Sequence, residues 1–89
     1  MRTLQVAVTG TRAQLTTQNL YASVIVASAS AASSFLGDDT VTTANGQILP
    51  TGTATPLVIL ATTPRGIPLN SLWVVGTSGN ANFLYEPSA

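Results

Sequence analysis

The sequence contains no cysteine, no histidine and no lysine. Without cysteine the chain has neither a disulfide framework nor a thiolate metal site. Without histidine it lacks the commonest general base, metal ligand and pH-sensitive group. Serine and threonine are abundant, but their hydroxyls have no histidine or lysine that could activate them as nucleophiles. These absences predict a protein that is not an enzyme and that has no catalytic residue, no metal site and no cofactor.

Charge is equally scarce, because charged residues make up 7% of the chain against about 25% in an average soluble domain. They are Arg2, Arg12, Arg65, Asp38, Asp39 and Glu86. The formal net charge is zero, so an isolated monomer is expected to associate. A surface that stays soluble through serine and threonine hydroxyls is the alternative. Without a basic patch, binding to nucleic acid is not expected.

The length of 89 residues predicts a single domain, 1–89, near the size at which one core is only just sufficient. The longest apolar stretch, 20–32, is too short and too rich in serine to cross a membrane. Residues 1–8 begin like a signal peptide, but the polar segment 9–19 follows where an apolar core and a cleavage site should lie. Oligomerisation is therefore the expected source of extra stability.

Turn-forming residues recur about every ten residues, the spacing of a sandwich or barrel of short strands. The predicted fold class is therefore all-β, a small antiparallel β-sandwich, jelly-roll-like, with about seven or eight short strands. Segment 3–9 alternates, with Leu4, Val6 and Val8 on one face, and predicts a half-buried strand. Residues 14–17 predict a short second strand.

The middle of the chain predicts three further features. The β-branched centre of 21–29 favours a strand with both faces covered. The small residues of 28–34 predict a flexible loop, with an alanine-rich helical turn as the alternative. A short strand at 35–37 leads to a turn at Asp38 and Asp39, and Asn-Gly at 45–46 predicts a two-residue hairpin.

In the last third, the apolar run 56–61 predicts a central strand. The proline-rich and glycine-rich segment 63–70 predicts a loop without regular structure. A strand at 72–75 is expected to turn at 78–80 and to pair with the strand 82–85 as a hairpin.

Asp38 and Asp39 follow Gly37 and superficially resemble the Gly-Asp-Asp hairpin that holds catalytic metals in RNA-directed polymerases. A polymerase needs several hundred residues, a third carboxylate beside the pair and basic walls; this chain is too short, has no basic walls and has its only other carboxylate at Glu86. A weak Ca²⁺ site would also need more oxygen ligands. The expected role is a turn in which aspartate side chains accept backbone N–H bonds.

The order of the short motifs resembles a small structural module of tailed-bacteriophage virions. The motifs are Leu15-Thr16-Thr17, Val24-Ile25-Val26-Ala27, Phe35-Leu36-Gly37-Asp38, Val41-Thr42, Asn45-Gly46, Ile48-Leu49-Pro50-Thr51-Gly52, Leu72-Trp73-Val74-Val75-Gly76-Thr77 and Leu84-Tyr85-Glu86. The resemblance covers roughly residues 14 to 86. It departs from the pattern in the Ala/Ser run 27–34 and in the loop 63–70.

The resemblance implies a compact β-sandwich that serves as a head decoration, or cement, protein. Such a protein would sit on the capsid surface of the virion after assembly in the host cytoplasm. Its partners would be the major capsid protein and copies of itself, as a homotrimer, with no membrane and no small-molecule substrate. A tail, neck or head-fibre component is the first alternative, and a cellular carbohydrate-binding or surface-layer module is the second.

This interpretation suggests where subunits would meet. Residues 1–13 could form an N-terminal strand or arm that adds to the sheet of a neighbour through main-chain bonds. Tyr21 and Tyr85 are candidate anchors, because tyrosine is enriched at interfaces, and Arg65 lies in a loop of the kind that makes specific contacts. The candidate interface residues are Leu4, Val6, Val8, Tyr21, Arg65 and Tyr85.

Overall fold

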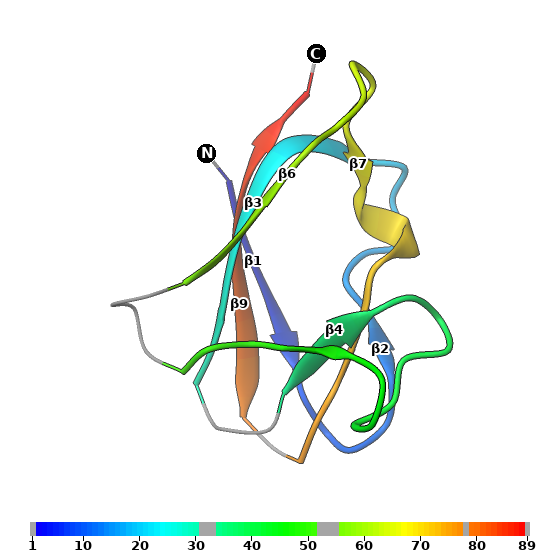
Figure 1. Cartoon of the computed structure of the whole chain (residues 1–89), viewed down its shortest axis with the longest axis vertical. Coiled ribbons are helices and arrows are strands. Elements are labelled where there is room, and N and C mark those ends of the chain that lie inside the picture. Colours follow the sequence, from blue (N-terminus) through cyan, green and yellow to red (C-terminus); the bar gives the residue numbers. More distant parts are fainter. Residues whose placement is uncertain (1, 31–33, 52–55, 78, 89) are drawn as a thin grey trace.

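The computed structural model of the chain describes residues 2–30, 34–51, 56–77 and 79–88. In these ranges the chain forms nine strands and one short 3₁₀ helix, arranged as a β-sandwich of two antiparallel sheets (Figure 1). The all-β sandwich predicted from the spacing of turns is therefore confirmed. Residues 31–33 of the predicted loop, Gly52 of the motif at 48–52 and Ser78 of the predicted turn lie outside the described residues.

The first sheet has five strands in the order β1-β9-β3-β6, with β7 paired to the start of β3. These strands are β1 (Arg2–Ala7), β3 (Tyr21–Ala29), β6 (Leu57–Leu60), β7 (Ile67–Pro68) and β9 (Asn80–Pro87). The second sheet has the order β2-β8-β4-β5. Its strands are β2 (Ala13–Gln14), β4 (Phe35–Gly37), β5 (Gln47–Ile48) and β8 (Trp73–Val75). The 3₁₀ helix η1 (Leu69–Ser71) connects β7 to β8.

The core lies between the two sheets and is built from the inward face of each strand. Side chains from both sheets and from the connections between them form one cluster: Val6, Val8, Leu15, Ala22, Ile25, Ala27, Ala29, Leu36, Leu49, Leu69, Val74, Ala81, Phe83 and Tyr85. Small alanines on β3 and β9 let the aromatic rings of Phe83 and Tyr85 fit between the layers.

The central strand β3 matches the predicted segment 21–29, but it has only one buried face. Ile25, Ala27 and Ala29 are buried, whereas Val24 and Val26 are half-buried and point to the other side of the sheet. A register shift between Ala22 and Val24 marks a β-bulge, so that Ala22 and Ile25 both face the core. Ser28 and Ala29 belong to this strand and not to the predicted loop.

The apolar run at 56–61 does form a strand, but β6 lies at the edge of its sheet and not at the centre. Val58 is 53% exposed and Leu60 is 68% exposed. A continuous apolar run does not distinguish a doubly covered strand from an edge strand whose outer face is left open. The prediction of a central strand is wrong for this reason.

The last two strands do not form the predicted hairpin. β8 belongs to the four-stranded sheet, whereas β9 lies between β1 and β3 in the other sheet. The chain changes sheet at most of its connections, from β1 to β2, from β2 to β3 and from β3 to β4. Turn residues mark only that the chain reverses direction, so they do not reveal which sheet receives the next strand.

Three smaller predictions are also corrected. Segment 63–70 is not wholly irregular, because Ile67–Pro68 pairs with Tyr21 and Ala22. The short strand expected at 14–17 is β2, which ends at Gln14. The strand after Asn45-Gly46, β5, pairs with β4 and not with the segment just before the turn. Asn45-Gly46 is also not a two-residue type I′ turn, which needs positive φ at both residues. Instead the Asn45 side-chain oxygen accepts the Thr42 N–H at 2.7 Å.

Candidate functional site

The face of the five-stranded sheet that points away from the core is the most distinctive surface of the molecule. We call it the outer face. It carries the side chains that alternate with the buried ones: Thr3 and Gln5 of β1, Asn82, Leu84 and Glu86 of β9, Val24, Val26 and Ser28 of β3, and Val58 and Leu60 of β6. Alternation along each strand places them on one side of the sheet.

An apolar patch without a charged member occupies part of this outer face, and Glu86, the cross-strand partner of Val24, borders it. It consists of Val24, Val26, Val58, Leu60 and Leu84. Leu84 and Val58 are both cross-strand partners of Val26, and Leu60 is the partner of Val24. Leu84 is 41% exposed and is one of four exposed large apolar residues in the described chain, three of which lie in this patch. A grouped apolar surface of this kind marks a site of contact with a partner.

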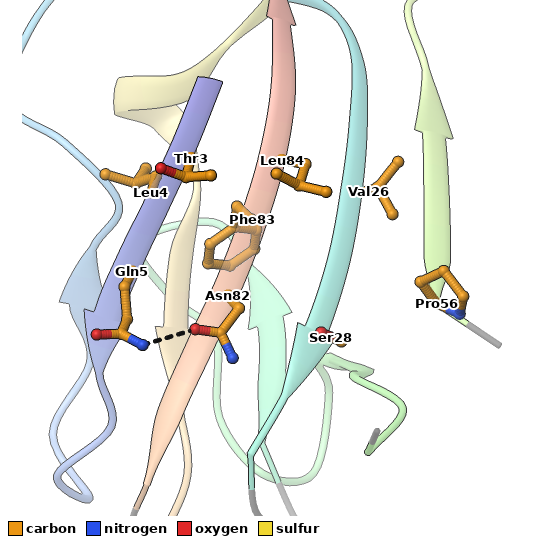
Figure 2. A pocket seen from close by; sticks show the side chains of 9 residues that line it. All are labelled: Thr3, Leu4, Gln5, Val26, Ser28, Pro56, Asn82, Phe83 and Leu84. Carbon is orange, nitrogen blue, oxygen red and sulfur yellow. Dashed lines mark hydrogen bonds between the residues drawn. The ribbon is translucent and has the colours of Figure 1, made fainter. Parts of the chain in front are cut away.

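A groove of about 550 Å³ borders the patch on the same face. Figure 2 shows Thr3, Leu84 and Val26 side by side across β1, β9 and β3, with Pro56 on the β6 side. The groove is polar at one end, where the Gln5 Nε2 donates a hydrogen bond of 2.8 Å to the Asn82 Oδ1 (Figure 2). The outer face is therefore a mixed surface, apolar near β6 and amide-bearing near β1.

The free edge of β6 adds unpaired main-chain groups to this surface. The Ala61 N–H donates to the Ser23 carbonyl at 2.9 Å, which makes residues 57, 59 and 61 the ones that bond to β3. Alternation then directs the N–H and C=O groups of Val58 and Leu60 away from β3. Within the described part of the chain no strand lies beyond β6 in the sheet.

The residues predicted to form an interface have different positions in the structure. Val6, Val8 and Tyr85 are buried in the core, with 9%, 3% and 7% exposure, so their side chains are not available to a neighbouring subunit in this conformation. Leu4 packs against the same core. The segment proposed as an arm, 1–13, contains β1, which pairs with β9 of its own chain. These four side chains thus pack in or against the core of their own chain, and their role at an interface stays a prediction.

The other two predicted residues, Tyr21 and Arg65, are brought together. The Arg65 guanidinium lies 4.9 Å from the centre of the Tyr21 ring, a cation–π contact. The Ser88 N–H donates to the Tyr21 carbonyl at 3.0 Å, and the Ser88 hydroxyl donates to the Arg65 carbonyl at 2.8 Å. Gly66 beside them has φ of +99°, and a side chain there would meet the Ala22 carbonyl. Together these contacts hold the start of β3, the segment before β7 and the residue after β9 against one another at one end of the five-stranded sheet.

Asp38 has the role predicted for it, as the acceptor of a tight turn. Its Oδ1 accepts the Thr40 N–H at 2.9 Å and the Thr40 hydroxyl at 2.6 Å. The Thr40 hydroxyl bond holds the pKa of the Asp38 carboxyl below its ordinary value, with smaller contributions from the Thr40 N–H and from the positive charge of Arg12. The side chain stabilises the connection from β4 towards β5.

A polar hollow of about 380 Å³ lies beside this turn on the four-stranded sheet. It is lined by Gln14, Asp38, Asp39, Asn70, Ser71 and Trp73. The Gln14 amide already donates to the Asn70 carbonyl at 2.6 Å.

In the described ranges no three acidic side chains come together in a way that could hold a metal ion. All five aromatic rings of the chain are buried or half-buried, so they do not form a flat exposed platform for a sugar.

The residues of the apolar patch were not among the predicted interface residues, although the alternation along residues 82–85 indicated that Leu84 is exposed. Phe83 and Tyr85 share one face of their strand, so Leu84 had to lie on the other. Val58 and Leu60 gave no such signal, because they belong to a continuous apolar run that is equally compatible with a buried strand.

The chain matches no protein-family model, no curated protein and no solved structure. No helix among residues 2–30, 34–51, 56–77 and 79–88 has the length and apolar character needed to span a membrane.

Proposed function

We propose that this protein is a non-enzymatic structural component of a tailed-bacteriophage virion, where it binds the head shell as a decoration, or cement, protein. The observation that carries the proposal is the uncharged apolar patch on an open sheet face. A monomer of this size that is free in solution gains nothing from exposing Val58, Leu60 and Leu84 together, whereas an assembly covers them.

The sparse charge of the surface supports the same conclusion. Six charged residues with zero net charge give little electrostatic repulsion between copies and little steering towards an oppositely charged partner. Contacts would come from apolar packing and main-chain bonds, which suit a permanent assembly better than a transient encounter. The partners we propose are the major capsid protein and other copies of the chain, at the capsid surface.

The virion assignment itself rests on the resemblance of the short motifs. In the structure the Leu36-Gly37-Asp38 and Asn45-Gly46 motifs form the connection between β4 and β5, and Asp38 and Asn45 each accept a backbone N–H there. These two motifs therefore specify turn geometry and lie away from the apolar patch, whereas the motifs at 24–27 and 84–86 contain its residues Val24, Val26 and Leu84. They support a shared architecture, while the patch supports the role in assembly.

The test is to mix the purified protein with shells that lack decoration and to measure co-sedimentation and shell heat resistance. We expect binding and a higher disruption temperature with the unaltered protein. Leu84→Lys, which places a charge in the patch, should abolish both effects. Ile48→Lys is the matched control, because Ile48 is 54% exposed but lies on β5 in the other sheet, and it should bind normally.

Two results would contradict the proposal. If the unaltered protein neither binds the shells nor raises their disruption temperature, the role in the head is wrong. Immunogold labelling confined to tails, necks or head fibres would assign the protein to one of those structures instead.

A further inference from the structure

The β6 edge is the least protected of the strand edges in the described part of the chain. Four strands end the two sheet paths, and two of them, β2 and β5, are only two residues long. β1 carries Arg2 and presents polar Thr3 and Gln5 on its outer face. Proteins protect free edges by shortness, charge or proline, and none of these devices occurs within the four residues of β6.

We propose that β6 is a self-association edge, which pairs antiparallel with β6 of a second copy across a two-fold axis at Ile59. In this register Val58 of one copy lies opposite Leu60 of the other. The outward N–H and C=O groups of both residues then form four interchain hydrogen bonds, while Ile59 faces its equivalent as a non-hydrogen-bonded pair. The two five-stranded sheets become one continuous sheet.

Side-chain matching favours a second copy as the occupant of this edge. Val58 and Leu60 would become cross-strand neighbours of Leu60 and Val58 from the other copy, so each exposed apolar side chain gains an apolar partner. Pairing of β6 with the free edge of β1 would instead place these side chains beside Thr3 and Gln5. That arrangement joins unlike edges and leads to rings or filaments, not to a closed pair.

Electrostatics do not oppose the self-association. Neither β6 nor the rest of the apolar patch contains a charged residue, and the chain as a whole has zero net charge. Glu86, which borders the patch, lies on β9, two strands away from the pairing edge. Like charges across a new strand pair would weaken it, and here there are none on the pairing strand. The outer faces of the two copies would also merge, so that one apolar patch runs across the dimer axis.

The contact is small, which sets the expected strength. The interface consists of four main-chain hydrogen bonds and two apolar side-chain pairs. Its buried area therefore lies at the low end of the range for specific complexes. We therefore expect a dissociation constant on the order of micromolar. The two-fold axis predicts a dimer, which replaces the homotrimer expected from the resemblance. The proposal concerns self-association alone and does not depend on the virion assignment.

The first experiment is sedimentation velocity of the full chain between about 1 and about 500 µM, a range that spans the expected constant. The unaltered protein should shift towards twice the mass of the 9.1 kDa chain as its concentration rises. Leu60→Lys should weaken the dimer roughly tenfold or more, because it removes two apolar pairs and places charge at the axis. Leu84→Lys, on the same face but on β9, should leave the dimer unchanged.

The second experiment uses the absence of cysteine from the chain, so that a single introduced cysteine gives an unambiguous crosslink. Ile59→Cys should form an interchain disulfide under mild oxidation, since the proposed register brings the two copies of residue 59 opposite each other. Val58→Cys should crosslink poorly, because its opposite residue is Leu60. Circular dichroism checks that both variants keep the β fold.

The proposal would be overturned by a protein that remains monomeric at the highest concentration or that forms trimers. It would also be overturned if Leu84→Lys disrupts self-association while Leu60→Lys does not, which would indicate contact through the outer faces. Equal crosslinking of the two cysteine variants, or no crosslinking of Ile59→Cys, would contradict the register. Because Leu84→Lys should block shell binding but not dimerisation, failure of either proposal can be recognised separately.

Discussion

At the scale of single residues, one buried side-chain hydroxyl in the described ranges has no hydrogen-bond partner there. The Ser34 side chain is fully buried, and its hydroxyl has no hydrogen-bond partner among the described residues. The backbone carbonyl of Ser34 does have a hydrogen-bond partner, because it accepts the Leu49 N–H at 2.8 Å. A buried hydroxyl without a partner loses its hydration and gains nothing in return. Position 34 thus needs a small side chain and not a polar one.

We therefore expect Ser34→Ala to stabilise the protein by about 1 kcal/mol, because the substitution removes the desolvated hydroxyl. The free energy of unfolding would be measured by urea denaturation. Ser30→Ala is the matched control, because the Ser30 hydroxyl oxygen accepts the Asn80 N–H at 2.8 Å, and its removal should cost about 1 kcal/mol. A loss of stability in Ser34→Ala comparable to that in Ser30→Ala would contradict the prediction.

Asp38 gives a prediction of pH dependence. Its pKa is lowered in the folded chain, so the native state favours the ionised carboxylate. The corresponding stabilisation is present above the unfolded value of about 3.9 and is lost as the pH falls through the lower folded value. Thr40→Ala removes the hydroxyl donor, which is the largest cause of the shift, and should move the Asp38 titration midpoint upwards.

The midpoint can be followed by carbon-detected NMR of the Asp38 carboxyl group. Thr40→Ser retains a hydroxyl and should keep the midpoint close to that of the unaltered protein. An unchanged midpoint in Thr40→Ala would show that the backbone N–H and not the hydroxyl bond causes the shift.

At the scale of elements, β6 provides a direct test of its edge position. In dilute solution the amides of Val58 and Leu60 should exchange with deuterium quickly, whereas those of Ile59 and Ala61, which bond to β3, should be protected. NMR-detected exchange of individual amides would show this alternation. Protection of all four amides at low concentration would contradict an open edge.

The same element shows what sequence reasoning could and could not predict. β3 and β4 were predicted with their exact bounds, because local composition and turn residues determine where a strand starts and stops. The position of β6 at an edge and the separation of β8 from β9 depend on which strands pair. Pairing is decided by packing between distant segments, and neither alternation nor turn composition carries that information.

The candidate site was predicted less completely than the fold, for a related reason. Leu4, Val6 and Val8 were predicted to lie at an interface because segment 1–13 was expected to extend to a neighbouring subunit. In the structure β1 pairs with β9 of its own chain, and the apolar face of β1 points into the core. The apolar patch appears only when β3, β6 and β9 lie side by side. A surface assembled from three distant segments has no signature in any one of them.

At the scale of the whole molecule, the scarcity of charge predicts how stability responds to salts. Few ion pairs can be screened, so the melting temperature should change by less than about 2 °C between about 50 and about 500 mM sodium chloride. Sodium sulfate should raise it, because sulfate strengthens apolar burial. Differential scanning calorimetry would measure both responses. A strong dependence on sodium chloride would indicate that electrostatic contacts contribute more than the composition suggests.

The pairing of β1 with β9 also has a consequence for biosynthesis. β1 is formed by residues 2–7 and its partner by residues 80–87, so the first of these strands leaves the ribosome long before the other exists. At a synthesis rate of about 5 to 20 residues per second the delay lasts roughly 4 to 15 s. During that time Val6 and Val8 have no sheet to cover them, and the five-stranded layer closes only after β9 has been made. Folding of this sandwich is therefore completed only after β9 has left the ribosome, and until then the apolar side chains of β1 are open to contact with neighbouring chains.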